Sequence, residues 1–403
     1  MILEGFVCVV ATLVSSLLGY AYHFAMTRLL APEDYGNLGV LLGLFMIATA
    51  PTVSLERAVA REVAKLDAQK KSAEIAFVVR KYVKLGFTVG LILGLSVYLL
   101  SYAVGWVYSQ DTLVFPVQLM AVMIPFWYVA MVLTGFLQGM EKVWALSFVT
   151  VIQPAVKLAG GVILVLAGLG LVGAAFPATL GALFVIPFVW FLCKSSLEDA
   201  REYEITLRKS VGLFLATDLV LSVILYLDLF YVRYFMSASD AGYYNVASVT
   251  AKVLLYATWG VLLIFLPKAS KLTLESRRAF SSLLWRGTAL ILPVALVFMV
   301  FPAQVISVFY TKSYLPAASS FRLLSFGLLV FGVYNLVLNV MWSQREEKIP
   351  LYGAVLSLAV DAMMLYYLVP KMGLLGAALS TTLASIMLLI PPLVWFKIKT
   401  RNN

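Results

Sequence analysis

Charged residues are scarce in this chain. Only 12% of its 403 residues are charged, whereas 62% are hydrophobic, and the mean hydropathy is +0.96. No water-soluble fold could cover so much apolar surface with so little polar surface. The composition therefore excludes a soluble globular protein and predicts a polytopic membrane protein.

Histidine, cysteine and enzymatic motifs are also nearly absent. The single histidine, His23, cannot form a His-rich metal site, and Cys8 and Cys193 lie far apart in apolar runs, so neither a disulfide nor a metal site is predicted. The chain lacks a phosphate-binding loop, a G-x-S-x-G motif and a dinucleotide fingerprint. We predict no enzyme, no cofactor and no ATP-driven pump. Any transport would then use an ion gradient, a membrane potential or the substrate's own gradient.

Long apolar runs are abundant, and many approach the roughly 20 residues that a helix needs to cross about 30 Å of hydrocarbon. Stretches such as "LVFGVYNLVLNVMW", 329–342, are apolar on nearly every face, unlike the strands of a membrane barrel. The first run lacks a small-residue cleavage site and is expected to remain as a span. We predict an all-α protein with about twelve spans. They cover residues 4–30, 36–55, 84–106, 114–137, 145–168, 172–193, 211–235, 242–266, 287–309, 320–342, 350–369 and 373–396.

Lysine and arginine are distributed unevenly between the two sets of loops that these spans define. The sparse set has five, namely Arg28, Arg233, Lys312, Arg322 and Lys371, while Lys157 and Lys252 lie inside spans. The remaining cations fall in the other set, which is predicted to be cytoplasmic together with both termini. They are Arg57, Arg61, Lys65, Lys70, Lys71, Arg80, Lys81, Lys84, Lys142, Lys194, Arg201, Arg208, Lys209, Lys268, Lys271, Arg277, Arg278, Arg286, Arg345, Lys348, Lys397, Lys399 and Arg401.

The net charge of +10 therefore reflects topology and predicts anionic membrane lipids as partners. The longest basic loop, from Arg57 to Lys84, alternates with Glu62, Asp67 and Glu74, as solvated helix extensions do. Because no soluble basic domain or aromatic-interleaved basic patch is present, no nucleic-acid partner is expected.

Two phrases occur twice in the chain. "RLLAPEDYGNLGV", 28–40, returns as "RYFMSASDAGYYNV", 233–246, and "GLGLVGAAFPATL", 168–180, returns as "KMGLLGAALSTTL", 371–383. The same displacement, about 205 residues, carries His23 onto Asp228. The chain is therefore predicted to contain two six-span halves, an N-lobe over 1–200 and a C-lobe over 201–403, with a charged linker over 194–210. An even number of spans per half makes this a parallel repeat.

The first phrase also has a local interpretation. A span ends at Leu30, and the following Ala-Pro stops it because proline cannot continue the backbone hydrogen bonds. Glu33 and Asp34 are expected to cap the next helix from its N-terminal side. A hairpin turn explains either copy alone, but only duplication explains the same turn at the same place in both halves.

In combination, these motifs resemble the polysaccharide transporter (Wzx-type, O-antigen flippase) family of the multidrug/oligosaccharidyl-lipid/polysaccharide superfamily. The resemblance rests on "RLLAPEDYG" after the first span, an acid in the seventh span followed by "AGYY", and "GLVGAA" and "GLLGAA" before the sixth and twelfth spans. It implies two pseudo-symmetric lobes around a central cavity lined mainly by spans 1, 2, 7 and 8. It also implies that polyprenyl-diphosphate-linked oligosaccharide is flipped to the outer leaflet of the cell membrane by alternating access, with glycan polymerase machinery as a partner.

Ionisable residues within spans mark candidate sites, because a charge in lipid is costly. Spans 1, 7 and 8, which the resemblance places at the cavity, contain His23, Arg28, Asp218, Asp228, Arg233 and Lys252. We predict substrate binding by Lys252, whose neighbour Asn245 suggests a wetted helix face, since cations suit a diphosphate or an acidic sugar. Arg28 and Arg233 are further candidates, although snorkelling to headgroups explains them equally well.

Gating or coupling to H⁺ or Na⁺ is assigned to His23, Asp228 and Asp218. His23 and Asp228 occupy matching repeat positions and are predicted to meet at the closed outer end of the cavity. The local alternative gives His23 a backbone carbonyl and Asp228 a tyrosine of its own lobe. Lys157 and Asp361, in spans 5 and 11, are interpreted as polar links within their lobes.

Other classes of protein remain open. A cation-coupled multidrug antiporter shares the superfamily fold, but an acid would then be expected in the first span, where this chain has His23 and Arg28. The lipid II flippase branch also resembles the chain, yet it typically has more than twelve spans. A non-transporting scaffold would not need paired charges inside its spans. The flippase is therefore favoured over the antiporter.

Overall fold

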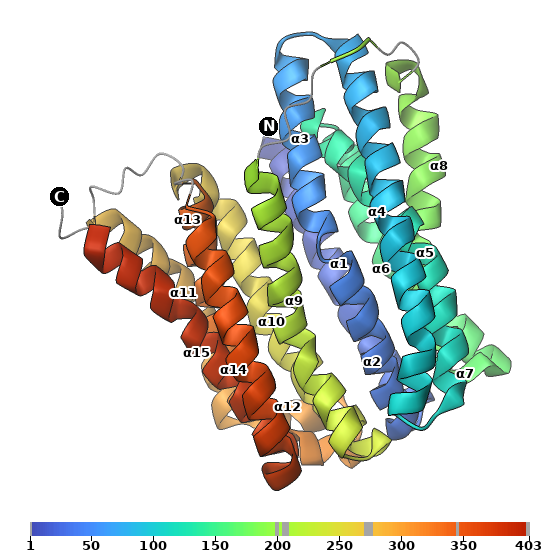
Figure 1. Ribbon diagram of the computed structural model, residues 1–403, viewed down its shortest axis with the longest axis vertical. Helices are drawn as coiled ribbons and strands as arrows, with labels where there is room; N and C mark the ends of the chain where they lie inside the picture. The colour runs from blue at the N-terminus through green and yellow to red at the C-terminus, as the bar shows by residue number, and fades with distance from the viewer. Residues whose placement is uncertain (1, 198–200, 204–208, 270–276, 344–345, 400–403) are drawn as a thin grey trace. The chain divides into compact units, whose positions relative to one another are not determined.

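The computed structural model describes residues 2–197, 201–203, 209–269, 277–343 and 346–399, and its elements are helices (Figure 1). No strand occurs in these ranges. Ten helices are long and apolar enough to span a membrane, and a bent pair can be counted as an eleventh. Helix α10 (Ala238–Ala269) covers the remaining predicted span, although its side chains beyond Thr258 lie outside the described residues. The predicted all-α, multi-pass fold is confirmed.

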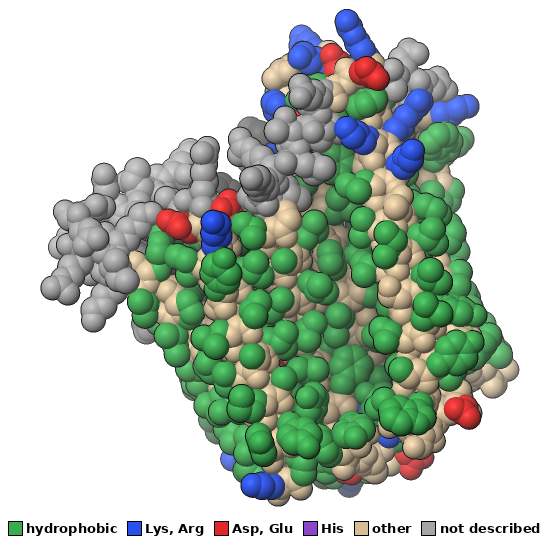
Figure 2. Space-filling model, viewed as in Figure 1, with side chains coloured by type: hydrophobic (Ala, Val, Ile, Leu, Met, Phe, Trp, Pro, Cys, Tyr) green, Lys and Arg blue, Asp and Glu red, His purple; other side chains and the backbone are tan. Residues whose placement is uncertain are grey.

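Apolar side chains cover the outer surface. Figure 2 shows hydrophobic side chains over most of one face, with charged side chains gathered toward its two ends. Large apolar residues such as Leu17, Trp106 and Phe191 expose 69%, 82% and 89% of their surface. Lipid, rather than water, is the solvent that such a surface requires.

The chain divides into two compact units, Met1–Leu219 and Val220–Asn403. The first contains α1 (Ile2–Leu29), α2 (Pro32–Thr49), α3 (Thr52–Ala68), α4 (Ser72–Val107), α5 (Val114–Gly139), α6 (Val143–Leu164), α7 (Gly170–Ala175) and α8 (Pro177–Leu197). Within it, α4 and α3 pack on α5, and α1 packs on α6. The predicted lobe boundary at residue 200 and much of the predicted linker lie outside the described residues.

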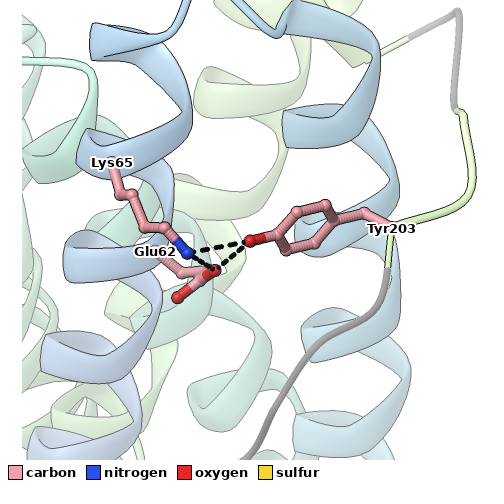
Figure 3. A network of polar contacts seen from close by, with 3 residues as sticks. All are labelled: Glu62, Lys65 and Tyr203. Atoms are coloured by element: carbon pink, nitrogen blue, oxygen red, sulfur yellow. Dashed lines mark hydrogen bonds and ion pairs between the residues drawn. The ribbon is translucent and has the colours of Figure 1, made fainter.

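The described part of the linker is tied to the first unit at the end of α3. The Tyr203 hydroxyl donates to Glu62 Oε1 at 2.8 Å, and Lys65 Nζ donates to the Tyr203 hydroxyl at 3.0 Å (Figure 3). The backbone N–H of Arg201 donates to the carbonyl of Ala73 at 3.0 Å. These bonds attach the stretch 201–203 to two neighbouring helices.

Helix α9 (Lys209–Phe235) crosses the division between the units. Its C-terminal part belongs to the second unit with α10, α11 (Arg277–Val300), α12 (Pro302–Phe309), α13 (Ala318–Ser343), α14 (Lys348–Met372) and α15 (Leu374–Lys399). In this unit α15 packs against α13 and α14, and α10 packs against α13.

The predicted span over 287–309 is not one continuous helix. Helices α11 and α12 meet at an angle of 94°, and Pro302 is the first residue of α12. Proline has no N–H to donate and its ring clashes with the preceding turn, so the chain restarts at Pro302 as a new helix. Apolar length alone does not reveal such a break.

The repeated turn is built differently in its two copies. After α1, Pro32 occupies the first turn of α2, and Glu33 and Asp34 follow it in that turn, where their negative charge suits the N-terminal end of the helix dipole. Before α10, the Ser237 hydroxyl accepts from the Asp240 N–H at 3.0 Å, while Asp240 Oδ2 accepts from the Ser237 N–H at 3.3 Å. This reciprocal arrangement is a capping box.

The second repeated phrase adopts the same backbone in both units. Gly170 and Gly373, which correspond in the repeat, have φ of +47° and +59°. Three residues later, a Cβ at Gly173 would lie 2.8 Å from the carbonyl carbon of Leu164, and one at Gly376 would lie 2.6 Å from that of Leu368. Only glycine allows these two backbone segments to approach so closely. The duplication seen in the letters is therefore also present in the backbone.

We expect Gly376→Ala to lower the free energy of unfolding by about 1–3 kcal/mol, because its Cβ meets backbone atoms that cannot rotate away. Gly19→Ala is the matched control, since a Cβ at that position meets nothing within 4 Å. Thermal unfolding of the purified protein in detergent, followed by tryptophan fluorescence, measures both. Equal midpoints for the two variants would contradict the close approach.

Candidate functional site

Asp228 is the centre of a buried polar group in the second unit. Its side chain, on α9, is only 1% exposed. The Tyr244 hydroxyl donates to Asp228 Oδ2 at 2.7 Å and the Thr381 hydroxyl at 3.1 Å, while the Leu229 N–H donates to Oδ1 at 2.7 Å. Donors from α9, α10 and α15 therefore converge on one carboxylate, which stabilises it as an anion. The bond to Tyr244 is the one expected from the local alternative.

A second carboxylate, Asp361 on α14, lies close enough to Asp228 for their charges to interact. The Asp361 side chain is fully buried, and neither of its oxygens has a hydrogen-bond partner among the described residues. The interpretation of Asp361 as a polar link is therefore wrong, because a link needs a bonded partner. A buried acceptor without a donor is costly unless a proton or a ligand satisfies it.

Lys252, on α10, is the cation of this group and is 6% exposed. Its Nζ lies 3.7 Å from the centroid of the Tyr226 ring, a cation–π contact, and its charge interacts with that of Asp228. In the described part of the chain, its N–H groups have no side-chain or backbone acceptor. We name Asp228, Asp361 and Lys252 the C-unit charge cluster. When all three are ionised, the two carboxylates and one ammonium leave one uncompensated negative charge.

The first unit has a corresponding polar group around α1. His23 Nδ1 is 3.0 Å from the Tyr35 hydroxyl, and the Tyr22 hydroxyl donates to the carbonyl of Ala174 at 2.8 Å. Lys157 Nζ lies 4.1 Å from the centroid of the Tyr22 ring. His23 and Asp228 thus each bond a tyrosine of their own unit, and the latch between them stays a prediction.

The other predicted site residues have distinct surroundings. Arg28 lies back along its own helix, where its Cζ is 3.4 Å from the Phe24 ring centroid and its Nη1 donates to the Phe24 carbonyl at 3.1 Å. Asp218 accepts a hydrogen bond from Ser54. Asn245 is buried and Arg233 is half-buried. Of the predicted residues, the structure brings Asp228 and Lys252 near one another.

Several residues of these groups were not predicted as site residues. Tyr244 and Thr381 lie 16 and 153 positions along the chain from Asp228, so no helical spacing could reveal their bonds. In the sequence, Tyr226 and Tyr22 cannot be distinguished from the other aromatic residues of the predicted spans. The signal that was available is the repeat itself, because "YNV" and "STTL" sit in the two duplicated phrases.

Buried charges inside a helical multi-pass protein with an internal repeat are typical of membrane transporters. Comparison with family models matches residues 3–258 to "Polysaccharide biosynthesis protein" and residues 225–402 to "Lipid II flippase MurJ". The first match covers more than half of the chain. The chain therefore belongs to the polysaccharide biosynthesis protein family, in the flippase group of the superfamily that its motifs resemble.

Solved structures with the same fold cover nearly the whole chain. An inward-facing multidrug resistance MATE family transporter has a TM-score of 0.72 and 14% identity, over 98% of this chain and 97% of that one. The lipid II flippase MurJ, in an inward closed conformation, has a TM-score of 0.70 and 16% identity, over 98% and 88%. Identities this low show the fold alone.

A curated relative is the uncharacterized membrane protein MJ1068 of Methanocaldococcus jannaschii, 27% identical over 198 residues. The match covers 46% of this chain and 38% of that protein. The chain thus matches well under half the length of this relative.

Proposed function

We propose that the chain is a flippase that moves polyprenyl-diphosphate-linked oligosaccharide from the cytoplasmic to the outer leaflet of the cell membrane by alternating access. Both termini are cytoplasmic in this proposal, because the cation-rich loops are retained on that side. Anionic lipids contact these loops, and glycan polymerase machinery receives the product.

The observation that carries the proposal is the pair of lysines held on tyrosine rings inside the membrane, Lys252 on Tyr226 and Lys157 on Tyr22. An ammonium in lipid whose N–H groups have no acceptor among the described residues favours an anionic ligand, and phosphate is a natural partner of lysine. The family match supports the same class of substrate.

The C-unit charge cluster is proposed to couple this movement to a cation gradient. One uncompensated negative charge in a low dielectric is costly, so Asp228 and Asp361 together should take up a proton or Na⁺. Carboxylate and hydroxyl oxygens, the latter from Tyr244 and Thr381, are suitable ligands for a hard cation. The coupling ion is then held entirely within the second unit.

Depletion of the protein in its own cells tests the function. We expect lipid-linked glycan to accumulate on the inner leaflet, where an impermeant lectin reaches it only after the membrane is opened, while efflux of a cationic dye is unchanged. Re-expression of the wild-type chain should restore surface glycan. A defect in dye efflux with normal glycan export would instead support the cation-coupled multidrug antiporter.

A further inference from the structure

Lys157 is a half-buried cation near the middle of the spanning segment Val143–Ala175. The described residues offer its ammonium one contact, the face of the Tyr22 ring at 4.1 Å. A ring face attracts the charge but accepts none of the three N–H groups in a good hydrogen bond. The ammonium is therefore held by the ring, and its N–H groups have no hydrogen-bond acceptor among the described residues.

The Tyr22 ring that carries Lys157 is held firmly. Its hydroxyl donates to the carbonyl of Ala174 at 2.8 Å, and the side chain is fully buried. Gly161 makes room for it, because a Cβ there would lie 2.9 Å from the ring. A fixed ring fixes the place of the ammonium, which is what a binding site requires.

A second unused donor lies one helical turn before Lys157. The side-chain nitrogen of Gln153 is buried and has no hydrogen-bond partner among the described residues. Residues four apart lie on the same face of a helix. Gln153 and Lys157 thus bring two kinds of donor to one region of α6, and the described residues provide no acceptor for either.

The internal repeat allows Lys157 and Tyr22 to be compared with the equivalent residues of the second unit. The displacement that relates Lys157 to Asp361 also relates Tyr22 to Tyr226, on whose ring Lys252 lies. In the second unit the position is an acid beside another acid, whereas in the first unit it is a cation. The equivalent positions of the two units therefore have opposite charge, and no acid among the described residues forms an ion pair with Lys157.

We propose that Lys157, seated on Tyr22, binds a phosphate or other anionic group of the substrate, as a second anion site apart from Lys252. This inference rests on the proposed function for its substrate class but not for its geometry. Hydrogen bonds from the ammonium to phosphate would satisfy the N–H groups that have no acceptor among the described residues. Each unit would then hold one anion-binding lysine on a tyrosine ring of its first helix.

Calorimetric titration of the purified full chain tests the site with three probes: inorganic diphosphate, farnesyl diphosphate and farnesol. We expect both diphosphates to bind and farnesol not to. Lys157→Met, which keeps the length but removes the charge, should weaken diphosphate binding at least about ten-fold. Tyr22→Phe, which keeps the ring but loses the hydrogen bond that fixes it, should bind more weakly than the wild type, and Tyr22→Leu should bind more weakly still.

Lys142→Met is the matched control, since Lys142 is also half-buried but already donates to Cys193 Sγ at 3.4 Å. Thermal midpoints verify that each variant is folded. If Lys157→Met binds both diphosphates as the wild type does, or if the wild type binds neither, the Lys157 site is wrong. If inorganic diphosphate binding depends on Lys157 but farnesyl diphosphate does not bind, the anion site at Lys157 is supported and a polyprenyl-diphosphate carrier is contradicted.

Discussion

Asp361→Asn is expected to abolish the dependence of glycan export on a cation gradient. The variant keeps the shape of the side chain but removes the negative charge that has no counter-charge within the C-unit charge cluster. Moving one elementary charge across 100 mV is worth about 2.3 kcal/mol, which equals about a 50-fold accumulation ratio. Loss of one coupled charge would remove that much of the driving force.

Reconstituted vesicles with an imposed pH, Na⁺ or electrical gradient measure this effect on a fluorescent lipid-linked glycan. Gradient-driven flipping by Asp361→Asn should fall to the rate without a gradient, while its thermal midpoint should equal or exceed that of the wild type, because a costly buried charge is gone. Asp67→Asn, which changes an exposed aspartate at the end of α3, is the matched control. Full gradient dependence in Asp361→Asn would exclude this carboxylate from coupling.

Which gradient the wild type uses then distinguishes the coupling ion. A proton binds to one carboxylate oxygen and needs no further ligand, whereas Na⁺ requires several oxygens around it. Thr381→Val removes one candidate oxygen from the Asp228 group. It should therefore weaken Na⁺ coupling strongly and proton coupling little.

The helical fold could be predicted from the sequence because the bilayer leaves few choices. A span must satisfy its backbone internally and must be apolar along its length, so "LVFGVYNLVLNVMW" could only be a spanning helix. The duplication was also predictable, because both copies require glycine at the same position. A Cβ at Gly173 or at Gly376 would lie too close to backbone atoms. Such glycines cannot be replaced without moving two segments.

The bonds inside the units could not be predicted, because they depend on which helix faces are in contact. Asp228 was predicted as a site residue because a charge within a span is costly in lipid. Its partners Tyr244 and Thr381, however, come from two other helices. Asp361 was misread because its repeat position suggested a bonded link, whereas its oxygens have no partner in the described residues. The break at Pro302 was missed because the flanking residues remain apolar through the bend.

Lys252→Ala is expected to lower the apparent affinity for lipid-linked glycan by about ten- to a hundred-fold, the loss of one hydrogen bond to a charged partner. Membrane abundance should not change, because alanine favours an α-helix. Lys252→Arg should keep part of the activity, since it retains the charge but alters the shape. Lys81→Ala is the matched control, because Lys81 is exposed and its Nζ lies 5.8 Å from the Phe77 ring centroid.

A weaker glycan export in Lys252→Ala has a second explanation that must be separated from substrate binding. Lys252 also interacts with Asp228, so its removal leaves the two carboxylates without a counter-charge and could disturb ion coupling alone. The double variant Lys252→Ala, Asp228→Asn decides between the two roles, because it restores the charge balance of the cluster without restoring a cation for the substrate. If Lys252 binds the substrate, glycan affinity stays low in the double variant when flipping is measured without any gradient. If affinity returns to the wild-type value under those conditions, Lys252 serves only to balance Asp228, and the anion site of the second unit is wrong.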